Sequence, residues 1–182
     1  MVGIFAFIDF QCVFSPEQNT SWCVPKFNQA LQTAMLTCEK LKPNCVPIAT
    51  AYIPPNDIKG IWKTYFDKYP DIPRNPCNKI FDIDSSISGI DKLRYAGFSK
   101  WKSLAKIFKH ELEHDPENIL YLCGVATDCC VLSTALEAVE SGIKVCIIKD
   151  GCASGDDATH ERALKIMEGY SPNIEIKDSS MF

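Results

Sequence analysis

The sequence predicts an α/β protein with a three-layer α/β/α architecture around a mostly parallel sheet of roughly six strands. The first observation is that short apolar runs alternate along the chain with longer segments whose apolar residues recur at helical spacing. The second is the length of 182 residues, which suits one domain with a full core. No internal repeat, linker or low-complexity tract divides the chain. We therefore expect a single domain over residues 1–182.

The same patterns place the individual elements. Buried strands are predicted at residues 2–8, 45–53, 119–123, 144–148 and 174–176. Helices are predicted at residues 26–42, 99–114, 127–141 and 156–170, the second of them capped by Ser99 and ended by Asp115-Pro116. Residues 54–88 carry several prolines and aromatic side chains and predict a long, partly helical excursion that shapes a pocket. Since ligands bind beyond the carboxyl ends of the strands in such sheets, residues that follow strands are the first candidates for a site.

Composition and charge exclude several function classes. Apolar residues make up 46% and charged residues 23%, and no run is long enough to span a bilayer. The net charge of -4, without a basic cluster, predicts a small-molecule partner rather than nucleic acid or a membrane. The apolar first strand lacks a basic leading segment, which predicts a cytoplasmic protein. Most of the ten cysteines lie in strand-like or helical runs, so we expect packed thiols and no disulfide framework.

One thiol stands out from the others. Cys130 lies directly after an apolar, strand-like run that breaks at Gly124, and an amphipathic segment begins at Val131. This arrangement predicts a thiol in the first turn of a helix, where unpaired backbone N–H groups favour the thiolate and lower its pKa. Cys130 is therefore a candidate nucleophile. A base or a cation must lie beside it, and Asp9 and Lys92 are the candidates.

The motifs around these residues resemble a known family. Matching segments are Asp9-Phe10-Gln11, residues 92–98, residues 124–131, residues 150–154 and residues 160–164. Their order and residues are similar to those of the isochorismatase-like cysteine hydrolases, which include nicotinamidases, N-carbamoylsarcosine amidases and ureidoacrylate hydrolases. The segment 124–131 is the most specific of them. The resemblance extends over nearly the whole chain and implies a Rossmann-like sheet and, because relatives commonly assemble, a homo-oligomer.

The resemblance also implies a role for each matching residue. Asp9 would be the general base, Lys92 the supporting cation and Cys130 the nucleophile. A cis peptide would join Val125 to Ala126, and would aim the Ala126 N–H, together with that of Cys130, at a developing oxyanion. The implied reaction is cleavage of a C–N bond in a small amide or carbamoyl compound through a thioester.

One departure from the family bears on cofactors. Nicotinamidases carry a metal-binding Asp-x-His-Pro-x-x-His sequence after the second strand, whereas this chain has Ala51 and Ile53 at the first two ligand positions. Neither side chain can ligate a metal, so we expect a metal-free enzyme without a cofactor. Pocket residues are predicted near the motifs and on the excursion: Gln11, Phe14, Tyr52, Trp62, Tyr95, Phe98 and Cys129.

Three alternatives remain open at this point. The chain could be an isochorismatase-type vinyl-ether hydrolase, although that reaction does not need a cysteine nucleophile in the same way. It could be a catalytically silent binding protein on the same fold. The segment His110-Glu111-Leu112-Glu113-His114 also matches the H-E-x-x-H pattern of zinc peptidases. We favour a structural role for that segment, because Asp115-Pro116 ends the helix at once and no third ligand is evident.

Overall fold

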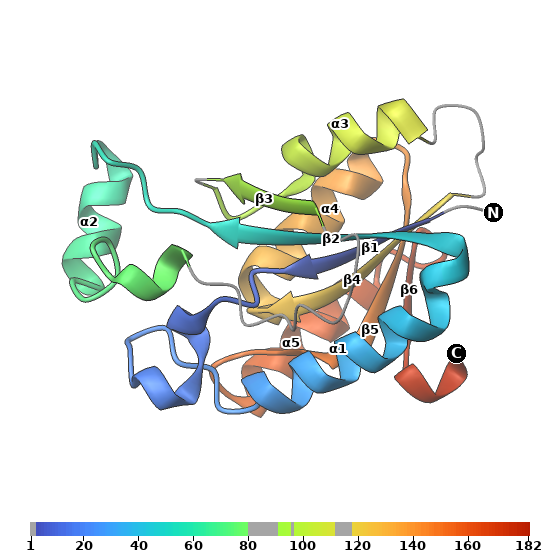
Figure 1. Cartoon of the computed structure of the whole chain (residues 1–182), viewed down its shortest axis with the longest axis horizontal. Helices are drawn as coiled ribbons and strands as arrows, with labels where there is room; N and C mark the ends of the chain where they lie inside the picture. The colour runs from blue at the N-terminus through green and yellow to red at the C-terminus, as the bar shows by residue number, and fades with distance from the viewer. Residues whose placement is uncertain (1–2, 80–90, 96, 112–117) are drawn as a thin grey trace.

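Six parallel strands form the central sheet of the protein (Figure 1). The computed structural model describes residues 3–79, 91–95, 97–111 and 118–182. Within them the strands are β1 (Gly3–Ile8), β2 (Cys45–Tyr52), β3 (Asp91–Tyr95), β4 (Ile119–Val125), β5 (Lys144–Ala153) and β6 (Ile174–Lys177). The predicted α/β architecture with a parallel sheet is confirmed. The sequence patterns missed β3, because its charged residues do not make an apolar run.

The order of the strands places the site. It is β3-β2-β1-β4-β5-β6, so β1 pairs with β2 on one side and with β4 on the other. The chain winds outward in opposite directions from β1 and β4, and a crevice opens at such a switch point beyond the carboxyl ends of the strands. Asp9 follows β1 and the segment with Cys130 follows β4. These two predicted site residues therefore meet at the same edge.

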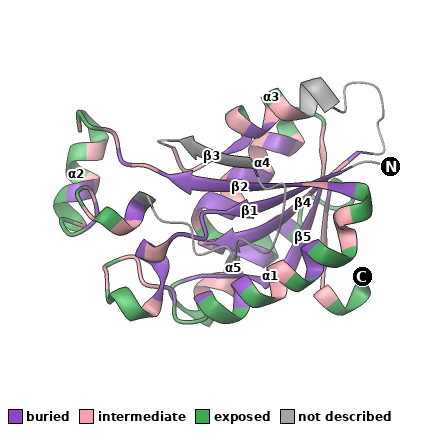
Figure 2. Cartoon of the chain, in the orientation of Figure 1, coloured by how far each residue is buried: buried purple, intermediate pink, exposed green. Residues whose placement is uncertain are grey.

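Helices cover both faces of the sheet. Helix α1 (Phe27–Leu41) packs on the face that carries Phe5 and Phe7. Helices α3 (Trp101–Glu111), α4 (Leu132–Glu140) and α5 (Asp157–Glu168) lie on the opposite face, over Ile4 and Ile8. The alternation follows from the two-residue period of a strand, and every residue of β1 is buried (Figure 2). In the described part of the chain, no helix is long and apolar enough to cross a membrane.

The predicted excursion contains a short helix, α2 (Ile61–Lys68), and a 3-10 turn at Pro76–Lys79. Figure 1 shows α2 beyond the carboxyl ends of the strands, outside the two helical layers. Its inner side chain Phe66 is 4% exposed. The excursion therefore forms a wall over the crevice, and its residues 80–88 lie outside the described part.

Two element boundaries differ from the sequence prediction. Strand β5 runs to Ala153, five residues beyond the predicted end, because Gly151 lets it pass Cys123; an added Cβ would lie 2.7 Å from that sulfur. The predicted helix at 127–141 begins as one turn of π-helix, Thr127–Val131, before α4. Ser99 precedes α3 and accepts a hydrogen bond from the Trp101 N–H at 3.2 Å, as expected for a cap.

Candidate active site

Asp9 lies at the bottom of the crevice with none of its surface exposed. It is the first residue after β1 and has a φ of 53°, a conformation that aspartate tolerates better than most residues. Thr50, near the end of β2, holds it from the side: its hydroxyl donates to Asp9 Oδ1 at 2.8 Å and accepts from the Asp9 N–H at 3.2 Å. The carboxylate is therefore fixed in orientation before any ligand arrives.

A buried lysine pairs with this carboxylate. Lys100 Nζ lies 2.8 Å from Asp9 Oδ2, and neither side chain is exposed. The ammonium also donates to the carbonyl oxygens of Gly97 and Phe98, at 2.6 and 3.0 Å. Burial is the largest single effect on the pKa of Lys100 and lowers it, but the charge of Asp9, its hydrogen bond and the two neighbouring thiols together raise the pKa above its usual value. The lysine is therefore a permanent cation. Asp9 Oδ2 has no well-aligned hydrogen bond besides this ion pair and keeps capacity to accept a proton.

The predicted cation was Lys92, whereas the cation beside Asp9 in the described structure is Lys100. Lys92 lies on β3 opposite Ala49, and its side chain is outside the described part. Its role stays a prediction. Sequence reasoning missed Lys100 because a lysine before a helix usually lies on the surface. The position of Lys100 just before α3 could have revealed its role. A cation at the N-terminus of a helix is electrostatically unfavourable unless a carboxylate compensates its charge.

Cys130 lies in the turn Thr127–Val131 and is 4% exposed. The approach to this turn requires glycine, because Gly124 has a φ of 149° and an added Cβ would lie 2.2 Å from the carbonyl oxygen of Ile8. The peptide bond between Val125 and Ala126 is cis. Thr134 connects the turn to the lysine: its hydroxyl donates to the Cys130 carbonyl at 2.6 Å and accepts from the Lys100 N–H at 2.9 Å.

The expected pKa of the Cys130 thiol was wrong in direction. A hydrogen bond with the Cys129 side chain and burial raise the pKa of Cys130 well above the usual value, and the Asp9 charge adds to this. Lys100 opposes the shift but does not reverse it. Proximity to a helix start is therefore outweighed by burial in an apolar crevice. The resting thiol is protonated, so a nucleophilic role requires a base.

Two further hydrogen bonds hold the turn from outside the crevice. The Thr127 hydroxyl lies 2.8 Å from His160 Nδ1 on α5. The Ser154 hydroxyl, just after β5, donates to Asp128 Oδ1 at 2.7 Å. His160 is half-buried, and burial lowers its pKa. His160 therefore holds the turn in place from the side of α5.

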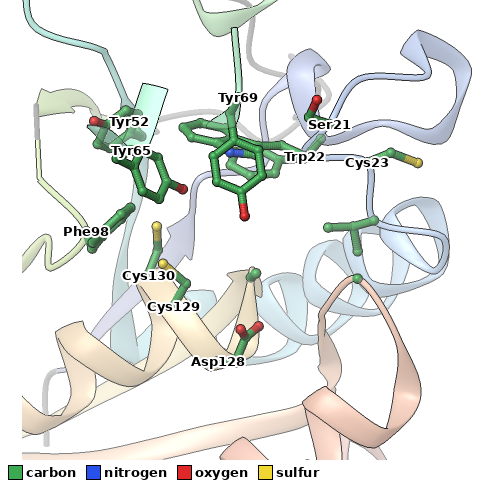
Figure 3. Close-up of a pocket in the computed structure, with 14 residues that line it drawn as sticks. Ser21, Trp22, Cys23, Tyr52, Tyr65, Tyr69, Phe98, Asp128, Cys129 and Cys130 are labelled. Atoms are coloured by element: carbon green, nitrogen blue, oxygen red, sulfur yellow. The ribbon is translucent and has the colours of Figure 1, made fainter. Parts of the chain in front are cut away.

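A cavity of about 200 Å³ opens directly above the thiols (Figure 3). Six of its fourteen lining residues are aromatic. Phe14 stacks on Trp22 with ring centroids 5.3 Å apart, and Tyr52 stacks on Phe98 at 5.9 Å. The described lining residues are Phe14, Ser21, Trp22, Cys23, Val24, Tyr52, Tyr65, Tyr69, Phe98, Ala126, Asp128, Cys129, Cys130 and Gly155. Such a cavity accepts a small molecule with a flat or apolar part.

Four of the seven predicted pocket residues line this cavity: Phe14, Tyr52, Phe98 and Cys129. Gln11 does not line it. Its amide N–H group donates to the carbonyl oxygens of Tyr52 and Asn78, and its amide oxygen accepts from the Tyr52 N–H. Trp62 lies behind the wall, 5.1 Å from Phe98 between ring centroids. The side chain of Tyr95 lies outside the described part.

No group of three or more potential metal ligands lies together among the described residues. At the end of β2, where nicotinamidases carry their first ligand, Ala51 is fully buried. The residues present here do not fit that metal. The side chain of His110, and all of His114, lie outside the described part, so the H-E-x-x-H segment stays an untested alternative.

The fold and the site together define the class of the protein: an α/β protein with a parallel sheet that carries a thiol and a buried carboxylate–lysine pair at its switch point. The model of the isochorismatase domain matches residues 4–175, and the chain therefore belongs to the isochorismatase family. Among curated proteins, it is 28% identical over 116 residues to an uncharacterized isochorismatase family protein, PncA of Bacillus subtilis, covering 63% of this chain and 58% of the relative. The match thus spans little more than half the length of that relative.

Two solved structures show the same fold over almost all of the chain. The pyrazinamidase of Pyrococcus horikoshii, determined in complex with zinc, has a TM-score of 0.77 and 25% identity, covering 98% of this chain and 99% of that one. A cysteine hydrolase from Pseudomonas syringae has a TM-score of 0.78 and 14% identity, covering 98% and 89%. At that lower identity the second likeness shows the fold alone.

Proposed function

We propose that the protein hydrolyses a C–N bond of a small amide or carbamoyl compound, with Asp9 as general base, Cys130 as nucleophile and Lys100 as supporting cation. The observation that carries this proposal is the fully buried Asp9–Lys100 pair beside a cysteine that faces a cavity. Burying two charges costs several kcal/mol per ion, which is hard to explain as a device for stability alone. Beside a thiol that needs a base, the pair has a chemical use.

The proposed reaction has two halves. The Cys130 S–H proton passes to the Asp9 carboxylate while sulfur bonds to the substrate carbonyl carbon; the C–N bond then breaks and Asp9 returns the proton to the leaving amine. A water molecule next gives a proton to Asp9 and bonds to the thioester carbonyl carbon. The C–S bond breaks, and Asp9 reprotonates the thiolate. Lys100 stays paired with Asp9 through these steps and balances its negative charge. The backbone N–H groups of Ala126 and Cys130 are the proposed oxyanion donors.

The charge of the cavity supports a neutral substrate. Its described lining includes one carboxylate, Asp128, and no lysine or arginine. Lys100 is fully buried beneath the cavity and already paired. An anionic substrate would meet no unpaired cation among these residues, and this favours amide chemistry over the dicarboxylate isochorismate. We also propose that the reaction needs no metal, because Ala51 stands at a ligand position of the nicotinamidases.

The test is a screen of small amides, ureides and carbamoyl compounds for ammonia release. The active compounds are then given to the Cys130→Ala variant and to Cys45→Ala, which removes a buried thiol at the opposite end of β2. We expect the first variant to lose turnover and the second to keep it. Full turnover by Cys130→Ala would refute the proposal, and a chain that binds these compounds without turnover would be the silent binding protein. Metal analysis of active protein checks the metal-free reaction.

A further inference from the structure

The wall of the cavity opposite the thiols carries a phenol. Tyr65 lies on α2, in the excursion, and lines the cavity together with Cys129 and Cys130. Figure 3 shows its hydroxyl directed into the cavity, on the same side as the two sulfur atoms of the turn after β4. A substrate that reacts with Cys130 must lie between these walls. The part of the substrate away from the reacting carbonyl therefore meets Tyr65.

The ring of Tyr65 is held in place by its neighbours. It meets Trp62 edge to face at a centroid distance of 5.7 Å, and Phe98 in the same manner at 5.5 Å. The ring of Tyr69, which also lines the cavity, lies 4.9 Å away between centroids. Aromatic pairs of this geometry are worth about 0.5–1.5 kcal/mol each beyond the area they bury. The hydroxyl is therefore presented in a defined direction and does not have to be ordered by the ligand.

The Tyr65 hydroxyl is a hydrogen-bond donor on the surface of the cavity. Burial, followed by the neighbouring Cys129, raises the pKa of Tyr65, so the phenol keeps its proton over the whole physiological range. The Trp22 ring lies 6.3 Å from that of Tyr65 between centroids, and since an indole N–H can only donate, it cannot accept the proton of the Tyr65 O–H. Among the described residues no acceptor for this proton is present.

We propose that Tyr65 determines specificity by donating a hydrogen bond to an acceptor atom on the acyl part of the substrate, on the side away from the carbonyl that Cys130 attacks. This inference rests on the proposed amide hydrolysis and deepens it. It predicts that the enzyme prefers amides whose flat acyl part carries such an acceptor at one position. A net hydrogen bond of about 0.5–1.5 kcal/mol corresponds to a preference of roughly two- to tenfold, and we expect the upper end because the donor is already oriented.

Four probes of equal shape test the inference: benzamide and the three pyridinecarboxamides, in which a ring nitrogen occupies each position in turn. The kcat/KM of ammonia release is measured for wild type, Tyr65→Phe and Tyr121→Phe. Tyr121 lies on β4, where it packs against Phe182, and it does not line the cavity. The Tyr121→Phe variant therefore controls for the loss of a phenol outside the cavity. Binding of the same probes to the Cys130→Ala protein, by calorimetry, separates recognition from chemistry.

We expect wild type to prefer one pyridine isomer over benzamide by about tenfold, and Tyr65→Phe to reduce that ratio to near one, with no change of the ratio in Tyr121→Phe. The same isomer should bind most tightly to Cys130→Ala. A preference that survives in Tyr65→Phe overturns the inference, as does a wild type that treats all four probes alike or binds none. If other amides are hydrolysed through Cys130 in that case, the proposed function stands without the Tyr65 role.

Discussion

Replacing Lys100 by methionine removes one partner of the buried ion pair and leaves the other in place. At the observed separation of 2.8 Å, an effective dielectric constant of about 20 gives a Coulomb attraction of roughly 6 kcal/mol. Desolvation cancels part of this, and breaking a buried pair from one side costs about 3–5 kcal/mol. We expect Lys100→Met to lower the free energy of unfolding by that amount, measured by urea denaturation followed through tryptophan fluorescence.

The same variant should lose catalysis. Without the ammonium, the buried Asp9 carboxylate holds its proton more tightly and no longer accepts one from Cys130. Loss of a general base reduces rates by about 10²–10⁴-fold, so we expect kcat to fall within this range where the folded protein is still populated. Steady-state ammonia release at low temperature provides the measurement.

A double variant separates the ion pair from simple packing. Asp9→Asn with Lys100→Met removes both charges, and the loss of stability should be clearly smaller than the sum of the two single losses. Lys92→Met is the matched control for the lysine of the family motif, and it should cost much less stability than Lys100→Met. If Lys92→Met abolishes both stability and turnover while Lys100→Met retains them, the assignment of Lys100 as the partner of Asp9 is refuted.

Three further predictions follow from the geometry. Alkylation of Cys130 by iodoacetamide should stay slow up to pH of about 8.5, the ordinary pKa of a cysteine, and accelerate only at higher pH, because the raised pKa keeps the thiol protonated. Fast labelling at pH 7, located by mass spectrometry, would contradict the raised pKa. Because the pKa of His160 is lowered in the folded protein, the unfolded chain binds a proton at this histidine more readily, and the free energy of unfolding should fall as pH falls below 6.5. The His160→Gln variant should show a weaker dependence of this free energy on pH in urea titrations. An unchanged pH dependence would contradict the lowered pKa. Gly124→Ala should destabilise the protein by several kcal/mol because the added Cβ would clash with the carbonyl oxygen of Ile8. Gly142 has a φ of 83° but open space around it, so Gly142→Ala should cost only about 1 kcal/mol. Equal melting temperatures of the two variants would show that the backbone moves to relieve the clash at Gly124.

The sequence predicted the parts of the site that local patterns determine. Asp9 and Cys130 follow apolar strands directly, and parallel strands bring their carboxyl ends to one edge. Lys100 was missed because its partner is 91 positions away in sequence and only the packed fold shows that the two charges meet. The direction of the Cys130 pKa failed for a related reason, because burial outweighed the helix start.

The wall of the cavity was predicted only in outline. The prolines and aromatic residues of the excursion indicated a pocket, but they did not tell which rings face it. Trp22, Tyr65 and Tyr69 line the cavity, whereas Trp62 lies behind it. Such choices depend on helix orientation and mutual packing, which no residue spacing within a short helix determines.

The cavity is thus assembled from two parts with different tolerance to change. Its floor is continuous with the hydrophobic core, since Cys130 packs with Ile8 and Val131 and Asp9 is held by β2. Its far wall comes from α2, outside the layers that cover the sheet (Figure 1). Substitutions in the floor disturb folding and chemistry together, whereas substitutions of the side chains that face the cavity from the wall change the shape and the polar groups offered to a ligand. A lineage can therefore acquire new substrates through substitutions in this one excursion while the reactive centre is inherited unchanged.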